Sequence, residues 1–263
     1  MRALLLSAGL GTRLRPLTDI WPKCLMPVRK RPLLEYWLET LRHAGIERAL
    51  VNLHYMPEPF TGFLKQPQYA DWVDSVYEPE LLGTAGTLRA NADFFQDKDF
   101  LLIHADNYCC CDFVDFIDFH TKRRPSNTVM TMMTFSTSVP RQCGIVKQDE
   151  YGIVQEFHEK VENPPGNHAN AAVYILDNQI LKWLLGQPAN VTDMSTQIIP
   201  HFLGSIASWH NDICHRDIGT IENFKAAQSD PLPPFHKTLK TTEWQRKFEL
   251  HPIHQYINNL LNN

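Results

Sequence analysis

Short apolar runs alternate with longer amphipathic segments along the first half of the chain. The run at residues 2–8 is rich in leucine and stops at a glycine turn, a length that suits a buried parallel strand better than a helix. Between Pro32 and Ala44, leucines and aromatic residues recur at helical spacing, and Gly45 follows where a helix commonly ends. The pattern next predicts strands at 47–55, 73–79 and 99–106, and a helix at 84–95. Strands that alternate with helices indicate a doubly wound, mostly parallel α/β sheet with its ligand site at the carboxyl ends of the strands.

The second half of the chain changes character and contains more strand patterns. We expect a helix at 113–123, strands at 127–137, within 143–160 and at 170–177, a helix from Ser195 to Leu203 capped by Asp193 or Ser195, and a helix at 222–228. The predicted fold class is therefore α/β, with a doubly wound, mostly parallel Rossmann-like sheet, a small β-rich region at roughly 130–215 and a helical C-terminal tail.

The predicted main domain covers residues 1–227, and a proline-rich linker with a helical tail covers 228–263. The linker has the sequence SDPLPPFHK, and the tail has amphipathic spacing that is interrupted near Pro252. The apolar face of this tail could dock on its own domain or on a neighbouring copy. Whether the protein forms a homo-oligomer therefore stays open.

Composition and charge narrow the class of protein. At 263 residues and 43% hydrophobic content, the chain can bury a large core. A net charge of −4 and a pI near 6.3 provide no basic field, so we expect neither nucleic acid nor membrane as a partner. No apolar run approaches the roughly 20 residues of a membrane-spanning helix, and the LLLSAG run lacks the features of a signal peptide. We expect a cytoplasmic enzyme or binding protein.

The six cysteines do not form a recognisable metal or disulfide pattern. Cys109, Cys110 and Cys111 are adjacent, and there is no C-x-x-C pair. Because neighbours on a strand point to opposite faces, three consecutive thiols cannot converge on one metal ion. We interpret them as reduced, buried small hydrophobic residues.

The stretch that follows the first strand, AGLGTRLRPLT, looks like a phosphate-binding loop. It lacks the lysine and hydroxyl residue that follow the second glycine of an NTPase P-loop, and Leu14 replaces the third glycine of a dinucleotide fingerprint. What remains is a glycine turn with backbone N–H groups and the guanidiniums of Arg13 and Arg15. This chemistry suits a polyphosphate.

Four motifs in order carry a resemblance to a known family. They are G-x-G-T-R-L-x-P-L-T followed by Pro22-Lys23, LLGTAGTL at 81–88, Asp106 at the end of a strand, and Asp217-Ile-Gly-Thr. Together they resemble the sugar-1-phosphate nucleotidylyltransferases, closest to the mannose-1-phosphate guanylyltransferases. The resemblance covers residues 2 to about 227, and it implies a reaction between a nucleoside triphosphate and a sugar 1-phosphate that forms an NDP-sugar and pyrophosphate.

The resemblance implies how the phosphates are held. Attack of a sugar phosphate on the α-phosphorus brings two anions together, so the site has to supply positive charge and alignment. Arg13 and Lys23 would be catalytic, Arg13 on the leaving pyrophosphate and Lys23 near the α-phosphate or the sugar phosphate. The implied nucleotide-binding residues are Ala8, Gly9, Gly11, Thr12, Arg13, Glu78, Glu80, Gly83, Thr84 and Gly86. We interpret Arg15 as a solvated loop residue.

The resemblance also implies a metal and an acceptor site. Mg²⁺ commonly binds one or two carboxylates together with substrate phosphates, and Asp106 and Asp217, both also catalytic, are the implied ligands. The β-rich region would bind the acceptor sugar. The implied sugar-phosphate-binding residues are Gly144, Glu159, Lys160 and Asn170.

Three alternatives stay open. A carboxylate from Glu78 or Glu80 could accept from N1–H and N2–H₂ of guanine, which favours GTP, but related uridylyltransferases also carry acids here. A non-catalytic homologue that binds a nucleotide sugar and regulates a partner would be expected to lose some of the charged residues. A phosphocholine-type cytidylyltransferase would keep the loop and alter the acceptor side, and Lys160 and Asn170 favour a sugar instead. Which sugar is bound is not predicted.

Overall fold

A computed structural model describes residues 1–233 and 242–262 of the chain. It divides into two compact units, each made of several segments. Unit 1 contains residues 1–4, 82–103 and 111–213, and unit 2 contains residues 5–81, 104–110 and 214–263. The predicted domain bounds divide the chain once, between residues 227 and 228, whereas each unit is made of several segments. These bounds stay predictions.

Unit 2 contains the first predicted strand–helix repeats. Its strands β4 (Arg48–Leu53) and β5 (Val73–Tyr77) pair in parallel, with Ala49 opposite Val73 and Leu53 opposite Tyr77. The strand β1 (Arg2–Leu6) divides between the units after Leu4. Other elements of unit 2 are β2 (Pro27–Val28), β3 (Arg31–Pro32), α1 (Leu33–His43), α2 (Pro57–Leu64) and α7 (Ile221–Ala227).

A pair of short antiparallel strands in unit 2, from distant parts of the chain, was not predicted from the sequence. Strand β7 (Asn107–Cys110) pairs antiparallel with β13 (Cys214–Asp217), and Asn107 lies opposite Asp217. The interpretation of the cysteines is confirmed, because Cys109, Cys110 and Cys111 are all buried and none forms a disulfide.

Unit 1 contains the β-rich region. Strand β11 (His168–Leu176) pairs antiparallel with β6 (Phe100–His104), β8 (Met130–Ser136) and β9 (Gly144–Gln148). Strand β12 (Ile206–His210) runs parallel to β8, and β10 (Val154–Glu159) is antiparallel to β9. Thus β6, β8, β9 and β12 share one direction, and β10 and β11 oppose it. The predicted α/β class with a large, mostly parallel sheet is confirmed.

The helices of unit 1 are short, and several were predicted. They are α3 (Thr84–Ala90), η4 (Ala92–Phe95), α4 (Phe113–Asp118), η5 (Phe119–Arg123), η6 (Pro140–Gln142), α5 (Asn178–Leu185), η7 (Met194–Ile198) and α6 (Ile199–His201). The predicted cap Asp193 is confirmed, because its carboxylate accepts from the amide of Thr196.

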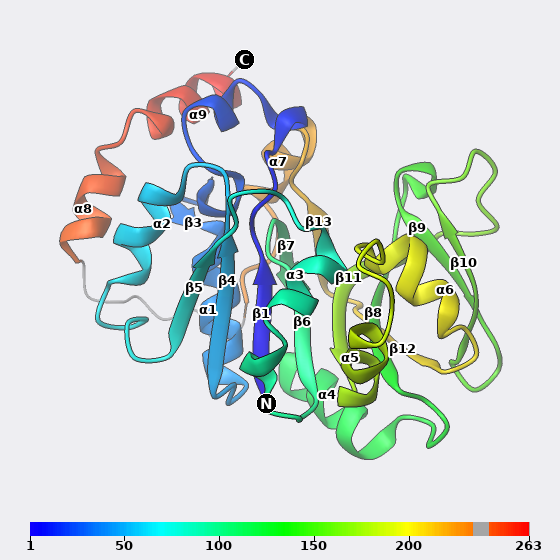
Figure 1. Cartoon of the computed structure of the whole chain (residues 1–263). Helices are drawn as coiled ribbons and strands as arrows, with labels where there is room; N and C mark the ends of the chain where they lie inside the picture. Colours follow the sequence, from blue (N-terminus) through cyan, green and yellow to red (C-terminus); the bar gives the residue numbers. More distant parts are fainter. Residues whose placement is uncertain (234–241, 263) are drawn as a thin grey trace. The chain divides into compact units, whose positions relative to one another are not determined.

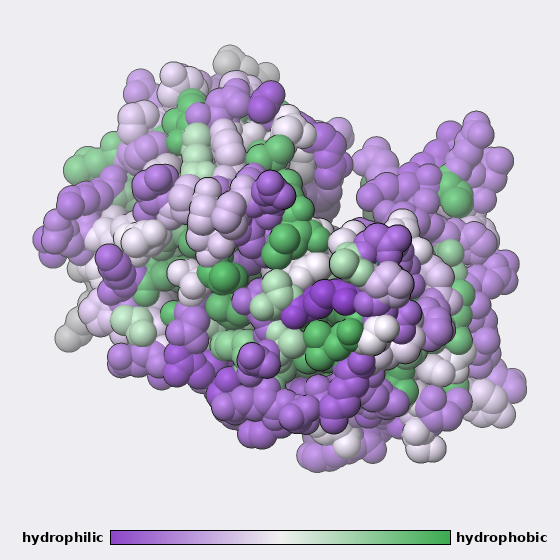
Figure 2. Space-filling model, in the orientation of Figure 1, coloured by the Kyte–Doolittle hydropathy of each residue, from purple (hydrophilic) through white to green (hydrophobic). Residues whose placement is uncertain are grey.

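Figure 2 shows mostly hydrophilic side chains over the β9–β10 hairpin, whose exposed residues include Lys147 and Gln148.

The described part of the C-terminal tail packs on its own unit. It forms α8 (Glu243–Glu249) and α9 (Ile253–Asn262), the last two helices in Figure 1, with the predicted break at Pro252. The rings of Trp244 and Phe63 lie 5.0 Å apart, and those of Phe248 and Trp21 lie 5.7 Å apart. Part of the predicted proline-rich linker, from residue 234 onward, lies outside the described residues. Of the two docking modes left open above, docking on its own unit is therefore observed.

Within residues 1–233 and 242–262, no helix combines the length and the apolar character that a membrane crossing requires.

Truncation of Phe248 tests how much the docked tail contributes to stability. Its side chain is 3% exposed, so Phe248→Ala leaves a cavity and should lower the free energy of unfolding by about 3 kcal/mol. The measurement is equilibrium unfolding in urea. Leu250→Ala is the matched control, because Leu250 is 85% exposed and its loss should change stability by less than about 0.5 kcal/mol. Equal effects of the two substitutions would contradict a docked tail.

Candidate functional site

A buried lysine lies between two carboxylates in unit 2. The ammonium of Lys23 donates to Asp106 Oδ2 at 2.8 Å and to Asp217 Oδ1 at 2.9 Å. Its side chain is only 5% exposed, whereas those of Asp106 and Asp217 are 32% and 42% exposed. Arg13 reaches the other oxygen of Asp217, with 3.0 Å between Nη2 and Oδ2. All four residues predicted to be catalytic therefore lie in one ion-pair network.

Strand pairing explains how residues so distant in sequence meet. Asp106 lies immediately before β7, and Asp217 is the last residue of β13. Because Asn107 and Asp217 are direct partners in the ladder, the two aspartates come to one end of this pair. Lys23 begins the short helical turn η3 (Lys23–Leu25), which Pro22 introduces with an extended backbone.

The charges of this network are stabilised against burial. Burial alone would lower the pKa of Lys23, but Asp106 and Asp217 outweigh it and raise that pKa above its ordinary value. Burial would likewise raise the pKa of Asp217, but Lys23 and Arg13 lower it to about 2. Burial lowers the pKa of His215 to about 4, so this neighbouring imidazole adds no charge at neutral pH. Asp217 is therefore ionised under all ordinary conditions.

Gly219, two residues after Asp217, has to be a glycine because the side chains of Asp217 and Arg13 approach its backbone closely. No role was predicted for it from the sequence. The amide of Gly219 donates to Asp217 Oδ1 at 2.8 Å. A Cβ atom at this position would lie 2.8 Å from that same oxygen and 2.9 Å from Nη2 of Arg13. Any side chain here would displace the Arg13–Asp217 pair, which explains the glycine of the Asp-Ile-Gly-Thr motif.

The loop after β1 has the features of an anion-binding turn. Gly11 has a φ of 62°, and a Cβ atom there would lie 2.8 Å from Thr18 Cγ2, so glycine is required. The hydroxyl of Thr18 donates to the carbonyl of Gly11 and braces the turn. Among the described residues, no hydrogen bond uses the amides of Gly9, Gly11 or Thr12. These N–H groups, beside buried Ala8 and the exposed guanidinium of Arg13, are available to phosphate oxygens.

Polar contacts connect the ends of β1, β4 and β5 in unit 2. Asn52, at the end of β4, accepts from the amide of Ser7 at 2.7 Å and donates to Glu78 Oε1 at 3.1 Å. Glu78 is buried with an exposed fraction of 3%, whereas Glu80 is exposed. The sequence analysis missed Asn52, although an amide inside the apolar run of β4 was a usable signal. Of the two carboxylates predicted to read the base, Glu80 is the accessible one.

The second glycine turn, in unit 1, has a packing function. A Cβ atom at Gly83, where φ is 78°, would lie 2.6 Å from the carbonyl oxygen of Thr192. That carbonyl accepts from the amides of Ala85 and Gly86, and the hydroxyl of Thr84 accepts from the amide of Met194. The structure thus explains Gly83, Thr84 and Gly86 by their contacts with the segment at 192–194. The predicted nucleotide contacts of these three residues stay predictions.

Three of the predicted sugar-phosphate residues lie together in unit 1. Gly144 is the direct partner of Glu159 in the β9–β10 ladder, and Lys160 Nζ lies 2.8 Å from Glu159 Oε1. A Cβ atom at Gly144 would lie 2.5 Å from Phe157 Cζ and 2.7 Å from Glu159 Oε2, so only glycine leaves the glutamate in place. Lys160 is 63% exposed and free to reach an anion.

Asn170 lies nearby on β11, because its neighbour Ala169 pairs with Ile145 of β9. Its amide nitrogen donates to the Tyr174 hydroxyl at 2.7 Å, and its oxygen accepts from the amide of Ala172 at 2.9 Å. These bonds brace an irregularity in the ladder between Asn170 and Tyr174. Asn170 therefore shapes β11, and its sugar contact stays a prediction.

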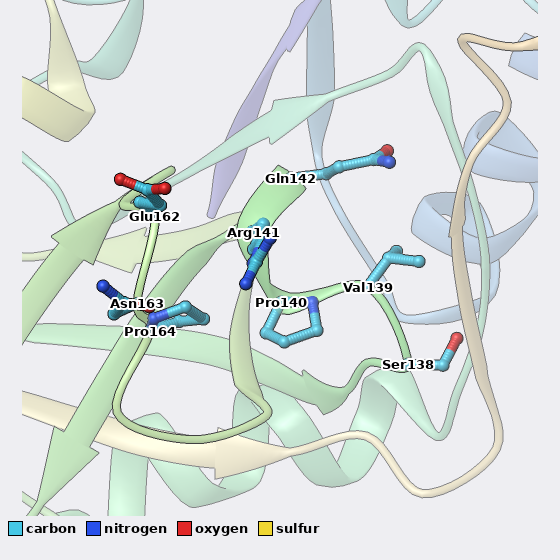
Figure 3. Close-up of a pocket in the computed structure, with 8 residues that line it drawn as sticks. All are labelled: Ser138, Val139, Pro140, Arg141, Gln142, Glu162, Asn163 and Pro164. Carbon is cyan, nitrogen blue, oxygen red and sulfur yellow. The ribbon is translucent and has the colours of Figure 1, made fainter.

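A hollow of about 580 Å³ lies next to these residues in unit 1. Figure 3 shows its two walls, the loop before β9 that carries Pro140 and Arg141 and the loop after β10 that carries Glu162 and Pro164. The first loop leads into Gly144 and the second follows Lys160. The lining carries one guanidinium, that of Arg141, and one carboxylate, that of Glu162, so the hollow is suited to a polar ligand.

Comparisons with known proteins agree with this arrangement. The profile described as "Nucleotidyl transferase" matches residues 2–232. The chain is 32% identical over 197 residues to the mannose-1-phosphate guanyltransferase of Aspergillus fumigatus, which covers 73% of this chain and 53% of that protein. The chain spans about half the length of the curated relatives it matches.

Two solved structures share the fold. One, from Bacillus anthracis and described as a glucose-1-phosphate thymidylyltransferase in complex with a sucrose, has a TM-score of 0.79 at 18% identity and covers 94% of this chain and 99% of that chain. The other, HddC from Yersinia pseudotuberculosis, has a TM-score of 0.71 at 24% identity and covers 86% and 97%. At these identities the likeness shows the fold alone.

The fold and the ion-pair network define an α/β protein with a glycine turn after β1 and a lysine paired with two carboxylates. The chain belongs to the nucleotidyl transferase family, and the family predicted from its motifs, the sugar-1-phosphate nucleotidylyltransferases, is confirmed.

The lowered pKa of Asp217 predicts a dependence of stability on acid. Because the folded pKa of about 2 lies below the ordinary 3.8, the ionised carboxylate stabilises the protein above pH 3.8, and this contribution is lost as the pH falls toward about 2. In Asp217→Asn, the urea midpoint should fall less steeply over this range. The exposed Asp71→Asn is the control and should keep the wild-type slope. Identical slopes in all three proteins would contradict the assigned ion pairs.

Proposed function

We propose that this protein transfers a nucleoside monophosphate from a nucleoside triphosphate to a sugar 1-phosphate, releasing pyrophosphate and forming an NDP-sugar. The observation that carries the proposal is the buried ammonium of Lys23 held between Asp106 and Asp217, with Arg13 on the same aspartate. Two carboxylates without a lysine or arginine beside them would suit many kinds of site. A lysine, an arginine, two carboxylates and a glycine loop with available amides suit a reaction between phosphates.

The carboxylates fit a divalent cation. An oxygen of Asp106 and an oxygen of Asp217 each lie within 3 Å of the same ammonium, so both can converge on one positive charge. Both side chains are partly exposed, and the low pKa keeps Asp217 ionised. We infer that they hold Mg²⁺, whose preferred ligands are carboxylate and phosphate oxygens. When bound, Mg²⁺ would neutralise phosphate charge in the transition state.

The residues of unit 2 would then divide the remaining work. The amides of Gly9, Gly11 and Thr12 would hold the β- and γ-phosphates, and Arg13, which is 63% exposed, would move from Asp217 to the charge that develops on leaving pyrophosphate. Lys23 would remain a fixed positive charge near the α-phosphate, because its buried side chain has little room to move. No general base is required, because a sugar phosphate oxygen is already ionised at neutral pH.

On the acceptor side, we infer that Lys160 pairs with the phosphate of the sugar and Glu159 accepts from its hydroxyls. The observations that support this are the contact between their side chains, the close packing of Gly144 beneath them, and the hollow beside Arg141. We favour GTP as the donor, with the exposed Glu80 accepting from N1–H and N2–H₂ of guanine and Glu78 held in place by Asn52. UTP is the alternative. The similarity to the mannose-1-phosphate guanyltransferase of Aspergillus fumigatus supports GTP.

Pyrophosphate release measures the reaction directly. Each of the four common nucleoside triphosphates is combined with hexose and heptose 1-phosphates, with and without Mg²⁺. We expect release with one base above the others, and a loss of about 100-fold or more in Asp106→Asn and Asp217→Asn. Asp71→Asn, an exposed acid of the same unit, should retain full activity. Wild-type activity in both variants would overturn the assignment, and silence across the panel with retained nucleotide-sugar binding would favour a regulatory protein.

The two loop arginines form a matched pair. Arg13 contacts Asp217, whereas Arg15 pairs with Asp19 at 3.0 Å and is 60% exposed. Because Arg13 is assigned to the leaving pyrophosphate, Arg13→Ala should lower kcat by roughly 100-fold, and Arg15→Ala should change it little. Steady-state kinetics of both variants, with melting temperatures to check folding, provide the measurement. A larger loss from Arg15→Ala would reverse their roles.

A further inference from the structure

A buried histidine of unit 1 faces two carboxylates away from all the residues assigned above. His120 lies in η5, directly after α4, and is 2% exposed. Its Nδ1 lies 2.8 Å from the hydroxyl of Thr131 on β8. Its Nε2 points to Asp99, just before β6, and to Asp177, the cap residue of α5. The three potential ligand atoms all lie within 4.8 Å of one another.

The distances around Nε2 do not suit hydrogen bonds. Nε2 lies 3.5 Å from Asp177 Oδ1 and 3.7 Å from Asp99 Oδ2, and N–H···O bonds are about 2.7–3.2 Å long. Among residues 1–233 and 242–262, no hydrogen bond satisfies Nε2. A buried ring nitrogen without a hydrogen bond is costly in either protonation state. If neutral with the proton on Nδ1, the imidazole directs a lone pair at two anions.

A bound cation would satisfy the buried Nε2 and neutralise the two carboxylates that face it. It accepts the lone pair of Nε2 and neutralises the carboxylates, and Thr131 then accepts from Nδ1–H, as a partner of a metal-bound histidine commonly does. Zinc ligands lie about 2.0–2.1 Å from the ion, so the ligand atoms of a tetrahedral site are about 3.4 Å apart. The separations of 3.5 and 3.7 Å are close to this value. An imidazole ligand favours Zn²⁺ over Mg²⁺ or Ca²⁺.

Surrounding groups hold the carboxylates in place. Asp99 Oδ1 accepts from the amide of Asn178 at 3.2 Å, which leaves Oδ2 for an ion. Arg124 donates to Asp177 Oδ2 at 3.1 Å, and its guanidinium lies 2.9 Å from Oδ1, an oxygen that accepts no hydrogen bond within the described residues. Two carboxylates and one guanidinium give the site a net charge of −1 before the imidazole is counted, which attracts a cation. The side chain of Asp99 is 46% exposed, so an ion can enter from solvent and keep a water as a fourth ligand.

We propose that His120, Asp99 and Asp177 bind one Zn²⁺ ion that stabilises unit 1. The ion would connect three segments, because its ligands come from the start of β6, from η5 and from the start of α5. None of these residues belongs to the site assigned to phosphate chemistry. The ion would therefore contribute to stability and take no part in phosphate transfer.

Zinc stoichiometry and thermal stability test the proposal in the full-length protein. The protein is stripped with a chelator, incubated with ZnCl₂ in excess MgCl₂ to occupy oxygen-only sites, desalted and analysed by elemental mass spectrometry. We expect one Zn²⁺ per chain, and a melting temperature raised by roughly 5 °C at a free Zn²⁺ concentration of about 100 times Kd. Asp99→Asn should lose the bound ion and this increase. The amide oxygen of that variant can still accept from Asn178, so folding should persist.

Two further variants exclude other sites. His120→Gln should also lose Zn²⁺, whereas His201→Gln, an exposed histidine of the same unit that stacks on Trp183, should keep it. Asp106→Asn should keep it as well, which separates this ion from the one proposed for phosphate transfer. Absence of stoichiometric Zn²⁺ in the wild type, or wild-type binding in Asp99→Asn, would overturn the proposal, whether or not His120→Gln folds.

Discussion

The buried ammonium of Lys23 between Asp106 and Asp217 is the interaction on which the candidate site of unit 2 depends. A charge that is 5% exposed is stable only when it is paired, and two carboxylates from distant segments provide that pairing. The same contacts keep Asp217 ionised and orient Arg13. In the proposed reaction, the side chains that neutralise one another in the folded protein would also act on the charges of the phosphates.

Glycines in both units mark places where backbone and functional side chains approach closely. At Gly219 and at Gly144, a Cβ atom would meet the carboxylates of Asp217 and Glu159, respectively. At Gly83 it would meet a carbonyl oxygen, so that glycine serves packing. The glycines in these motifs thus have two physical causes, and the identity of the neighbouring atom distinguishes them.

The helical tail shows how a short segment gains stability from tertiary contacts. Helices α8 and α9 are too short to be stable alone, and Phe248 and Trp244 attach α8 to aromatic rings of the same unit. Amphipathic spacing predicted the helices and the break at Pro252. It did not identify the surface they cover, because any apolar surface would satisfy the same spacing.

The alternation of strands and helices, the glycine turn after the first strand and the choice of candidate charged residues could be predicted from the amino-acid sequence. Periodicity and motif spacing are local properties and can be seen without the fold. The β7–β13 pair was not predicted, since four-residue strands that contain consecutive cysteines carry little periodic signal. Asn52 and the His120 cluster were missed for a related reason, because a polar residue shows its partners only when distant segments meet. Which charges are buried together depends on long-range pairing, which brings Lys23 to Asp106 and Asp217 and thereby raises the pKa of Lys23 and lowers that of Asp217.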